Sequence, residues 1–134
     1  MSPTPPDRLA IAASQDVVLV RNAVRMAAER MGFRHLDVTK LVTAASEIAR
    51  NTLVYGGGGT AAIECLQTFA RNGVRVLFED HGPGIADLSL AMREGYTTGS
   101  GMGLGLSGSK KLVDEFEIDS EPGRGTRVTM TKWR

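Results

Sequence analysis

The stretch Asp37–Gly59, with the sequence DVTKLVTAASEIARNTLVYGGGG, predicts a long amphipathic helix that stops at four consecutive glycines. Asp37 suits the N-cap, and the helix is expected to run to about Val54. Its apolar residues recur at helical spacing: Leu41, Val42, Ala45, Ile48, Ala49 and Leu53. Glu47 and Asn51 are four residues apart, so their side chains lie on one side of the helix, about one turn apart.

The pair Glu47 and Asn51 offers two chemical groups that act on phosphates. An amide oxygen is a hard ligand that suits Mg²⁺ beside phosphate oxygens and water. A carboxylate can take a proton from an attacking hydroxyl or water. Taken alone, the two residues favour the alternative reading, a solvated glutamate and a helix-interior asparagine without a role.

The segments around this helix predict alternating strands and helices. Before it, a strand over residues 9–13 precedes a helix that Ser14 or Asp16 caps and Gly32 ends. After it come strands near 60–70 and 74–79 joined by an Asn72-Gly73 turn, a short helix over 86–93, a helix over 104–116, a strand over 116–120, a turn over 121–125 and a strand over 126–133. The fold class is therefore α+β, a two-layer sandwich of a mixed, mostly antiparallel sheet with helices on one face.

Length and composition indicate one globular unit. The 134 residues are expected to form a disordered lead over 1–7 and a single domain over 8–134. A net charge of +1 points to no nucleic-acid partner, and no apolar run is long enough for a membrane span. The first residues lack the apolar core of a signal peptide, so a cytoplasmic location is expected. Cys65, the single cysteine, is expected to be a small buried side chain.

A second segment, Asp80-His81-Gly82-Pro83-Gly84, follows an apolar strand. An acid at a strand end followed by two glycines lets the backbone approach a flat ligand, and a carboxylate accepts from the exocyclic amine of adenine. The alternative is an ordinary turn, for which these residues are also typical. His81 has no second His or Cys at ligand spacing and is expected to be a loop residue.

A third segment, Gly99-Ser100-Gly101-Met102-Gly103-Leu104-Gly105, precedes a predicted helix. Successive backbone N–H groups and a helix N-terminus form an anion site, which suits phosphates. The G-x-G-x-x-G pattern at Gly103–Gly108 is rejected as a dinucleotide site, because no buried strand precedes it. Thr126, after Gly125, either reaches a purine directly or through water, or is simply a strand-favouring residue.

These segments, in this order, resemble the N-box, G1 box and G2 box of the GHKL (Bergerat-fold) ATPases. The resemblance implies ATP and Mg²⁺ as cofactors, with Glu47 as general base and Asn51 as the Mg²⁺ ligand. It implies that Asp80 binds the adenine amine, that Thr126 completes the purine contact, and that residues 86–102 form an ATP lid. Gly82 and Gly84 would shape the base pocket, and Gly99, Gly101, Gly103, Leu104 and Gly105 would face the phosphates.

Within that family, the segments Val42–Glu47, Asn51–Gly56 and Leu112–Ile118 look most like the stressosome switch kinases, small serine/threonine kinases of bacterial partner-switching modules. The resemblance implies phosphorylation of a STAS-domain partner, with a PP2C-type phosphatase or a sigma factor as a further partner. The alternatives are an anti-sigma factor kinase that sequesters a sigma factor, and a non-catalytic ATP-binding module. The roles of Arg50, Arg93, Lys110 and Lys111 stay open.

Overall fold

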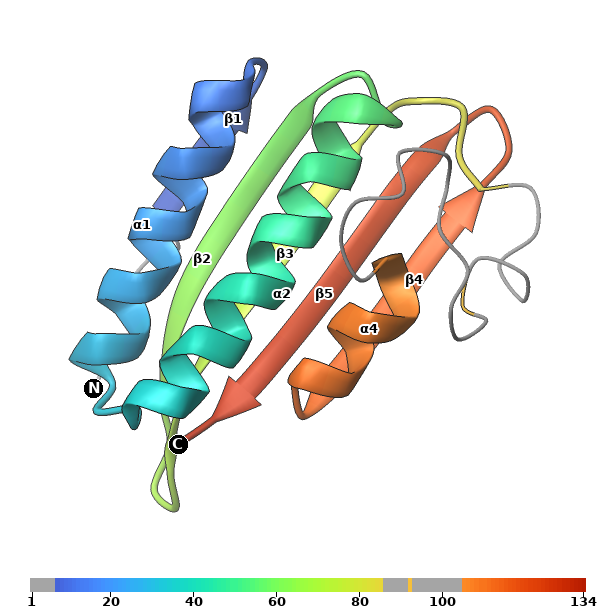
Figure 1. Cartoon of the computed structure of the whole chain (residues 1–134). Helices are drawn as coiled ribbons and strands as arrows, with labels where there is room; N and C mark the ends of the chain where they lie inside the picture. The colour runs from blue at the N-terminus through green and yellow to red at the C-terminus, as the bar shows by residue number, and fades with distance from the viewer. Residues whose placement is uncertain (1–6, 86–91, 93–104) are drawn as a thin grey trace.

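The computed structural model describes residues 7–85, 92 and 105–134 as a five-stranded sheet with three helices on one of its faces (Figure 1). The elements are β1 (Asp7–Ile11), α1 (Ser14–Arg30), α2 (His35–Val54), β2 (Gly59–Gln67), β3 (Asn72–Asp80), α4 (Gly105–Leu112), β4 (Glu115–Glu121) and β5 (Gly125–Trp133). The strand order is β1-β2-β3-β5-β4. The predicted α+β sandwich is confirmed, although all four strand pairings described are antiparallel and the sheet is not mixed.

The hydrophobic core lies between the helices and the sheet. On β3 the predicted alternation is confirmed, because Val74, Val76 and Phe78 are all at most 1% exposed. Leu41 and Ile48 of α2 are equally buried on the opposite side of this layer. Full burial of such a side chain contributes about 1.5–3 kcal/mol, so these positions hold α2 at a defined rotation against the sheet.

Helix α1 begins differently from the prediction. Its N-cap is Ala13, and neither Ser14 nor Asp16 caps it in the expected way. Asp16 lies in the first turn, and its Oδ2 atom accepts from the backbone N–H groups of Ala12 (2.8 Å) and Ala13 (3.0 Å). This arrangement is the acidic half of a capping box. The end is as predicted, since Gly32 follows the helix with φ of +79°.

Helix α2 begins at His35 with Arg34 as its N-cap, so Asp37 is not the cap that its residue type suggested. Asp37 lies instead in the first turn, where its carboxylate pairs with Lys132 of β5, with 3.7 Å between Oδ1 and Nζ. The helix ends at Val54, as predicted. Neither α2 nor any other helix in the described ranges is long and apolar enough to cross a membrane.

The turn of the β2–β3 hairpin was predicted at Asn72-Gly73, and this prediction is wrong. Both residues are paired within β3, Asn72 with Gln67 and Gly73 with Leu66. The turn is Thr68–Arg71, where the Thr68 hydroxyl donates to the Arg71 carbonyl (2.8 Å) and accepts from the Arg71 N–H (3.0 Å). These side-chain bonds close the turn without a glycine, and the centre of the turn lies three residues before the predicted position.

The prediction of one helix over residues 104–116 was too long. α4 ends at Leu112, and the Asp114 N–H already donates to the Thr131 carbonyl of β5 (3.0 Å). Pairing with β5 therefore begins before Phe116, which lies in β4 opposite Met130. The short helix predicted over 86–93 lies outside the described residues, apart from Met92 in a turn.

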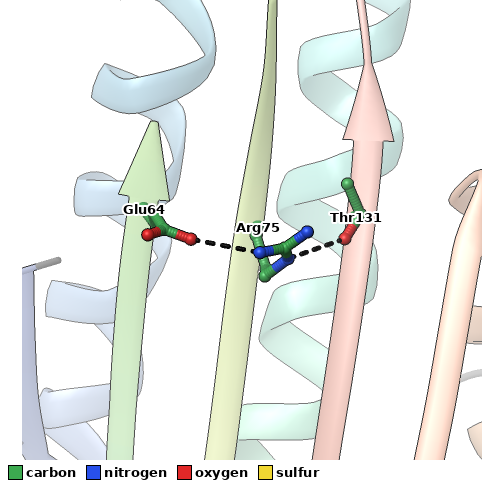
Figure 2. A network of polar contacts seen from close by, with 3 residues as sticks. All are labelled: Glu64, Arg75 and Thr131. Atoms are coloured by element: carbon green, nitrogen blue, oxygen red, sulfur yellow. Dashed lines mark hydrogen bonds and ion pairs between the residues drawn. The ribbon is translucent and has the colours of Figure 1, made fainter. Parts of the chain in front are cut away.

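The face of the sheet away from the helices is polar. Figure 2 shows Arg75 of β3 between Glu64 of β2 and Thr131 of β5. Its Nη1 atom lies 3.4 Å from Glu64 Oε1, and its Nε–H donates to Thr131 Oγ1 at 3.4 Å. Cross-strand pairs of this kind stabilise a sheet by about 0.2–1 kcal/mol each.

Candidate functional site

Helix α2 brings Glu47 and Asn51 to the edge of the buried layer. Ile48 and Ala49, which lie between them in the chain, are at most 1% exposed and fix the rotation of the helix. Glu47 and Asn51 are both half-buried as a result. Neither side chain has a hydrogen-bond or ion-pair partner within residues 7–85, 92 and 105–134. A carboxylate and an amide are thus held side by side with their polar atoms available to a ligand.

Asp80 ends β3, as predicted, and is 9% exposed. Its Oδ1 atom accepts from the backbone N–H of Gly82 (2.9 Å) and from the backbone N–H of Thr126 (3.3 Å). Hydrogen bonds to a carboxylate are among the stronger ones in proteins, so two of them hold this side chain in a single orientation. Both hydrogen bonds end on Oδ1, so Oδ2 is the carboxylate oxygen that accepts no hydrogen bond from the described residues.

The other oxygen of Asp80 lies against Gly56, the first residue of the glycine run after α2. A Cβ atom on Gly56 would stand 2.5 Å from Asp80 Oδ2. A Cβ atom on Gly82 would stand 2.7 Å from the Gly56 carbonyl oxygen. The loop after α2 and the turn after β3 therefore meet backbone to backbone, and any side chain at either glycine would displace the carboxylate or the turn.

Asn51 is connected to the same contact through its backbone. Its carbonyl oxygen accepts from the N–H groups of Tyr55 (2.9 Å) and Gly56 (3.1 Å). Gly57 and Gly58 then take φ angles of +74° and +102°, which return the chain to β2. The glycine run thus folds the end of α2 onto Asp80. It brings together the segments of Asn51 and Asp80, which are 29 residues apart in sequence.

Thr126 lies beside Asp80 in the sheet. The register places Ile11, Gly59, Asp80, Thr126 and Ser120 in one row across all five strands. Residues of one row point to the same face, and this row includes Ile11, which is 1% exposed in the core beneath the helices. The predicted purine-binding residues Asp80 and Thr126 therefore share the helix-covered face. Gly84 is close by, with φ of +76° and its Cα packed against the Glu121 carbonyl.

Ser120 is a polar residue of this row that the sequence analysis did not assign to the site. Its Oγ atom lies 2.8 Å from Thr126 Oγ1, and it accepts from the backbone N–H of Ile85 (2.8 Å). One signal was present in the sequence. The alternation of Phe116, Ile118 and Ser120 puts a serine where a third apolar residue would face the core.

The predicted phosphate-binding segment is described only at its end. Gly105 begins α4 with φ of +68°, and its carbonyl accepts from the Ser109 hydroxyl at 3.0 Å. Helix α4 packs against α2. Lys110 and Lys111 are exposed on it. Gly99, Gly101, Gly103, Leu104, Arg93 and the lid predicted over 86–102 lie outside the described residues, apart from Met92.

The structure also places His81, Arg50 and Cys65. His81 is exposed in the turn after β3, and the described residues contain no cluster of His, Cys, Asp or Glu side chains that would hold a metal by themselves. Arg50 is exposed on α2 and forms no ion pair with any described residue. Cys65 is half-buried rather than fully buried.

Comparisons with known proteins indicate the family of the chain. A family model described as histidine kinase-, DNA gyrase B- and HSP90-like ATPase matches residues 36–134. The serine/threonine-protein kinase RsbT of Bacillus subtilis is 40% identical over 118 residues, which cover 88% of this chain and 89% of RsbT. The anti-sigma F factor of Thermoanaerobacter sp. is 29% identical over 127 residues, covering 92% of this chain and 89% of that protein.

Solved structures show the same architecture. The RsbU and RsbW domains of a protein from Mycobacterium tuberculosis match with a TM-score of 0.67 and 25% identity, over 99% of this chain and 34% of that one. The mycobacterial sensor histidine kinase MprB matches with a TM-score of 0.56 and 15% identity, over 96% of this chain and 97% of that one. The second likeness is one of fold alone.

Proposed function

The chain belongs to the family of histidine kinase-, DNA gyrase B- and HSP90-like ATPases, and we propose that it is a serine/threonine-protein kinase that phosphorylates a STAS-domain partner in a stressosome-type partner-switching module. One observation carries the proposal. Glu47 and Asn51 have no side-chain partner among the described residues, and the loop that ends α2 folds Gly56 onto the Asp80 carboxylate, so the elements that carry groups suited to phosphates and to a purine meet at their ends.

In this proposal the Asp80 carboxylate binds the exocyclic amine of adenine, and Thr126 completes the contact with the base. The two N–H bonds to Oδ1 keep that carboxylate oriented. Gly82, Gly84 and the glycines that end at Gly105 let the nucleotide approach the backbone closely.

The residues present fit a Mg²⁺ ion. Asn51 offers one unpartnered amide oxygen, and no carboxylate cluster stands near enough to form a full protein cage among the described residues. Mg²⁺ keeps several waters and is held by one or two protein oxygens plus substrate phosphates, so a single amide ligand is appropriate. When bound, the ion neutralises charge on the phosphates.

The proposed reaction is the transfer of the terminal phosphoryl group of ATP to a serine or threonine hydroxyl. Glu47 takes the hydroxyl proton as the oxygen–phosphorus bond forms, and ADP leaves with the electrons of the broken bond. Most of the rate enhancement comes from positioning, which a rigidly packed helix supplies.

The surface around Glu47 suits a protein substrate. Thr43, Arg50 and Val54 share the side of α2 that carries Glu47, at spacings of three and four residues, and all three are exposed. None of the described elements covers this side. A folded partner can therefore bring a hydroxyl to Glu47 while it contacts Arg50, which pairs with no residue that the structure describes, and the apolar side chain of Val54, which is 57% exposed.

A second candidate function has its own support. The anti-sigma F factor of Thermoanaerobacter sp. matches over 92% of this chain, which favours an anti-sigma factor kinase that sequesters a sigma factor. In the M. tuberculosis protein an RsbU domain and an RsbW domain share one chain, which supports a PP2C-type phosphatase as a further binding partner. Sequestration and phosphatase binding require a binding surface and no catalysis. A measurement of phosphotransfer activity therefore distinguishes a non-catalytic module from a kinase.

The test is phosphotransfer with γ-labelled ATP and Mg²⁺ in a lysate of the source organism. The wild type is compared with Glu47→Gln and with Glu29→Gln, an exposed glutamate on α1 that serves as the matched control. Label on a small STAS-domain protein that is lost only in Glu47→Gln supports the proposal. Nucleotide binding without any transfer, together with co-purification of a sigma factor, would favour the second candidate.

A further inference from the structure

The Ser120 hydroxyl forms hydrogen bonds with three groups at the end of the row that contains Asp80 and Thr126. The backbone N–H of Ile85 donates to Ser120 Oγ at 2.8 Å, and Ser120 Oγ donates to the Gly125 carbonyl at 3.1 Å. The third contact is the 2.8 Å bond between Ser120 Oγ and Thr126 Oγ1. Ser120 comes from β4, Thr126 and Gly125 from β5, and Ile85 follows the Asp80 turn.

These contacts favour one direction for the bond between the two hydroxyls. An amide N–H can only donate and a carbonyl can only accept, whereas a serine hydroxyl has one proton and two lone pairs. The arrangement that satisfies all three contacts gives the Ser120 proton to the Gly125 carbonyl and one Ser120 lone pair to the Ile85 N–H. In this arrangement Thr126 donates to Ser120.

A Thr126 hydroxyl that donates to Ser120 has only lone pairs left for a ligand. Asp80, its neighbour in the row, is also an acceptor through its carboxylate. The two side chains together present acceptors alone to a base. The exocyclic amine of adenine has two N–H donors and satisfies such a pair directly or through a bridging water. A carbonyl at the same ring position, as in guanine, would face two acceptors in that orientation.

Resting on the proposed function of this site as an ATP site, we infer that Ser120 is a specificity-determining residue: its hydroxyl orients the Thr126 proton away from the base and so makes the site select adenine over guanine. Ser120 acts through Thr126 and is a positioning residue. Without the Ser120 acceptor, the Thr126 hydroxyl can turn and donate toward a guanine carbonyl, and discrimination falls more than affinity for adenine.

The experiment measures dissociation constants of the full chain for ADP and GDP with Mg²⁺ by isothermal titration calorimetry. Ser120→Ala and Ser120→Cys remove or weaken the acceptor, and Ser120→Thr restores it. Thr129→Ala is the matched control, because Thr129 is a half-buried β5 residue on the opposite face of the sheet. Circular dichroism checks the fold, and Ser120→Cys, which keeps the shape of the side chain but has a weaker acceptor, replaces Ser120→Ala if the alanine variant does not fold.

The expected result is that the preference for ADP over GDP falls about fivefold in Ser120→Ala and Ser120→Cys, the factor that one neutral hydrogen bond contributes. Ser120→Thr and Thr129→Ala are expected to keep the wild-type preference. An unchanged preference in a folded Ser120→Ala variant would overturn the inference, as would a wild type that binds both nucleotides equally. A wild type that binds neither nucleotide would instead refute the proposed ATP site.

Discussion

Gly56, at the end of the helix that carries Glu47 and Asn51, lies directly against the Asp80 carboxylate at the end of β3, so that a Cβ atom on Gly56 would stand 2.5 Å from Asp80 Oδ2. Because Asp80 is held by two backbone N–H groups, it cannot move aside without losing them. The contact therefore joins the end of α2, which carries the residues predicted to act on phosphates, to Asp80, the residue predicted to bind the purine.

Gly56→Ala is expected to weaken ADP binding about tenfold or more and to destabilise the fold by about 1–3 kcal/mol, because the new methyl group displaces a restrained carboxylate. Gly57→Asn is the control, since a Cβ at Gly57 meets nothing within 4 Å and Asn tolerates its φ of +74°. Calorimetric titration and thermal unfolding measure the two effects. Equal ADP affinity in both variants would contradict this role of Gly56.

Glu47→Gln is expected to lower the rate of phosphotransfer about 10²- to 10⁴-fold, because an amide of the same shape cannot take the proton of the attacking hydroxyl. ADP affinity is expected to stay close to that of the wild type, since Gln fits the same half-buried position on α2. Single-turnover transfer and equilibrium titration separate the two quantities. Transfer at the wild-type rate would show that Glu47 is not the base.

Asn51→Ala is expected to remove the effect of Mg²⁺ on nucleotide binding. In the wild type, EDTA should lower the affinity for ATP, because the ion no longer neutralises charge on the phosphates. The variant should bind weakly whether or not Mg²⁺ is present. Asn22→Ala, an exposed asparagine on α1, is the control and should respond to EDTA as the wild type does.

The Asp37–Lys132 pair makes a prediction about stability away from the site. Lys132 is 7% exposed, and its ammonium faces Asp37 at 3.7 Å. Asp37→Asn leaves a buried cation without its counter-charge and is expected to destabilise by about 1–3 kcal/mol. Lys132→Met removes the cation but keeps the apolar stem and is expected to cost less. Urea unfolding measures both variants, and a larger loss in Lys132→Met would contradict the burial argument.

The parts of the fold predicted well are those that depend on local periodicity. The spacing of apolar residues along 37–54 predicted the extent of α2 to within two residues, and the alternation at Val74, Val76 and Phe78 predicted which face of β3 is buried. The errors came where a distant group or a side-chain bond intervened. Thr68 closes the hairpin instead of Asn72-Gly73, and pairing with β5 ends α4 at Leu112.

The residues of the candidate site were likewise predicted in part from local sequence. The four-residue spacing of Glu47 and Asn51 was enough to put them on one side of a helix. Ser120 could not be assigned from its neighbours, because its partners Ile85 and Thr126 come from other segments. The sequence did not explain why residues 56–59 are all glycine. The structure explains the first of them, because Gly56 lies against Asp80.

The sequence alone predicted which residues bind phosphates and a purine, and it determined which sides of α2 and β3 are buried and that the fold is α+β, because burial pattern and fold class follow from residue type and from periods of 3.6 and 2. Only the tertiary structure decided that Asp80, Thr126 and Ser120 form one row and that Gly56 closes against it. Strand register and loop contacts are long-range, and they are determined by the packing of the whole sheet beneath its helices.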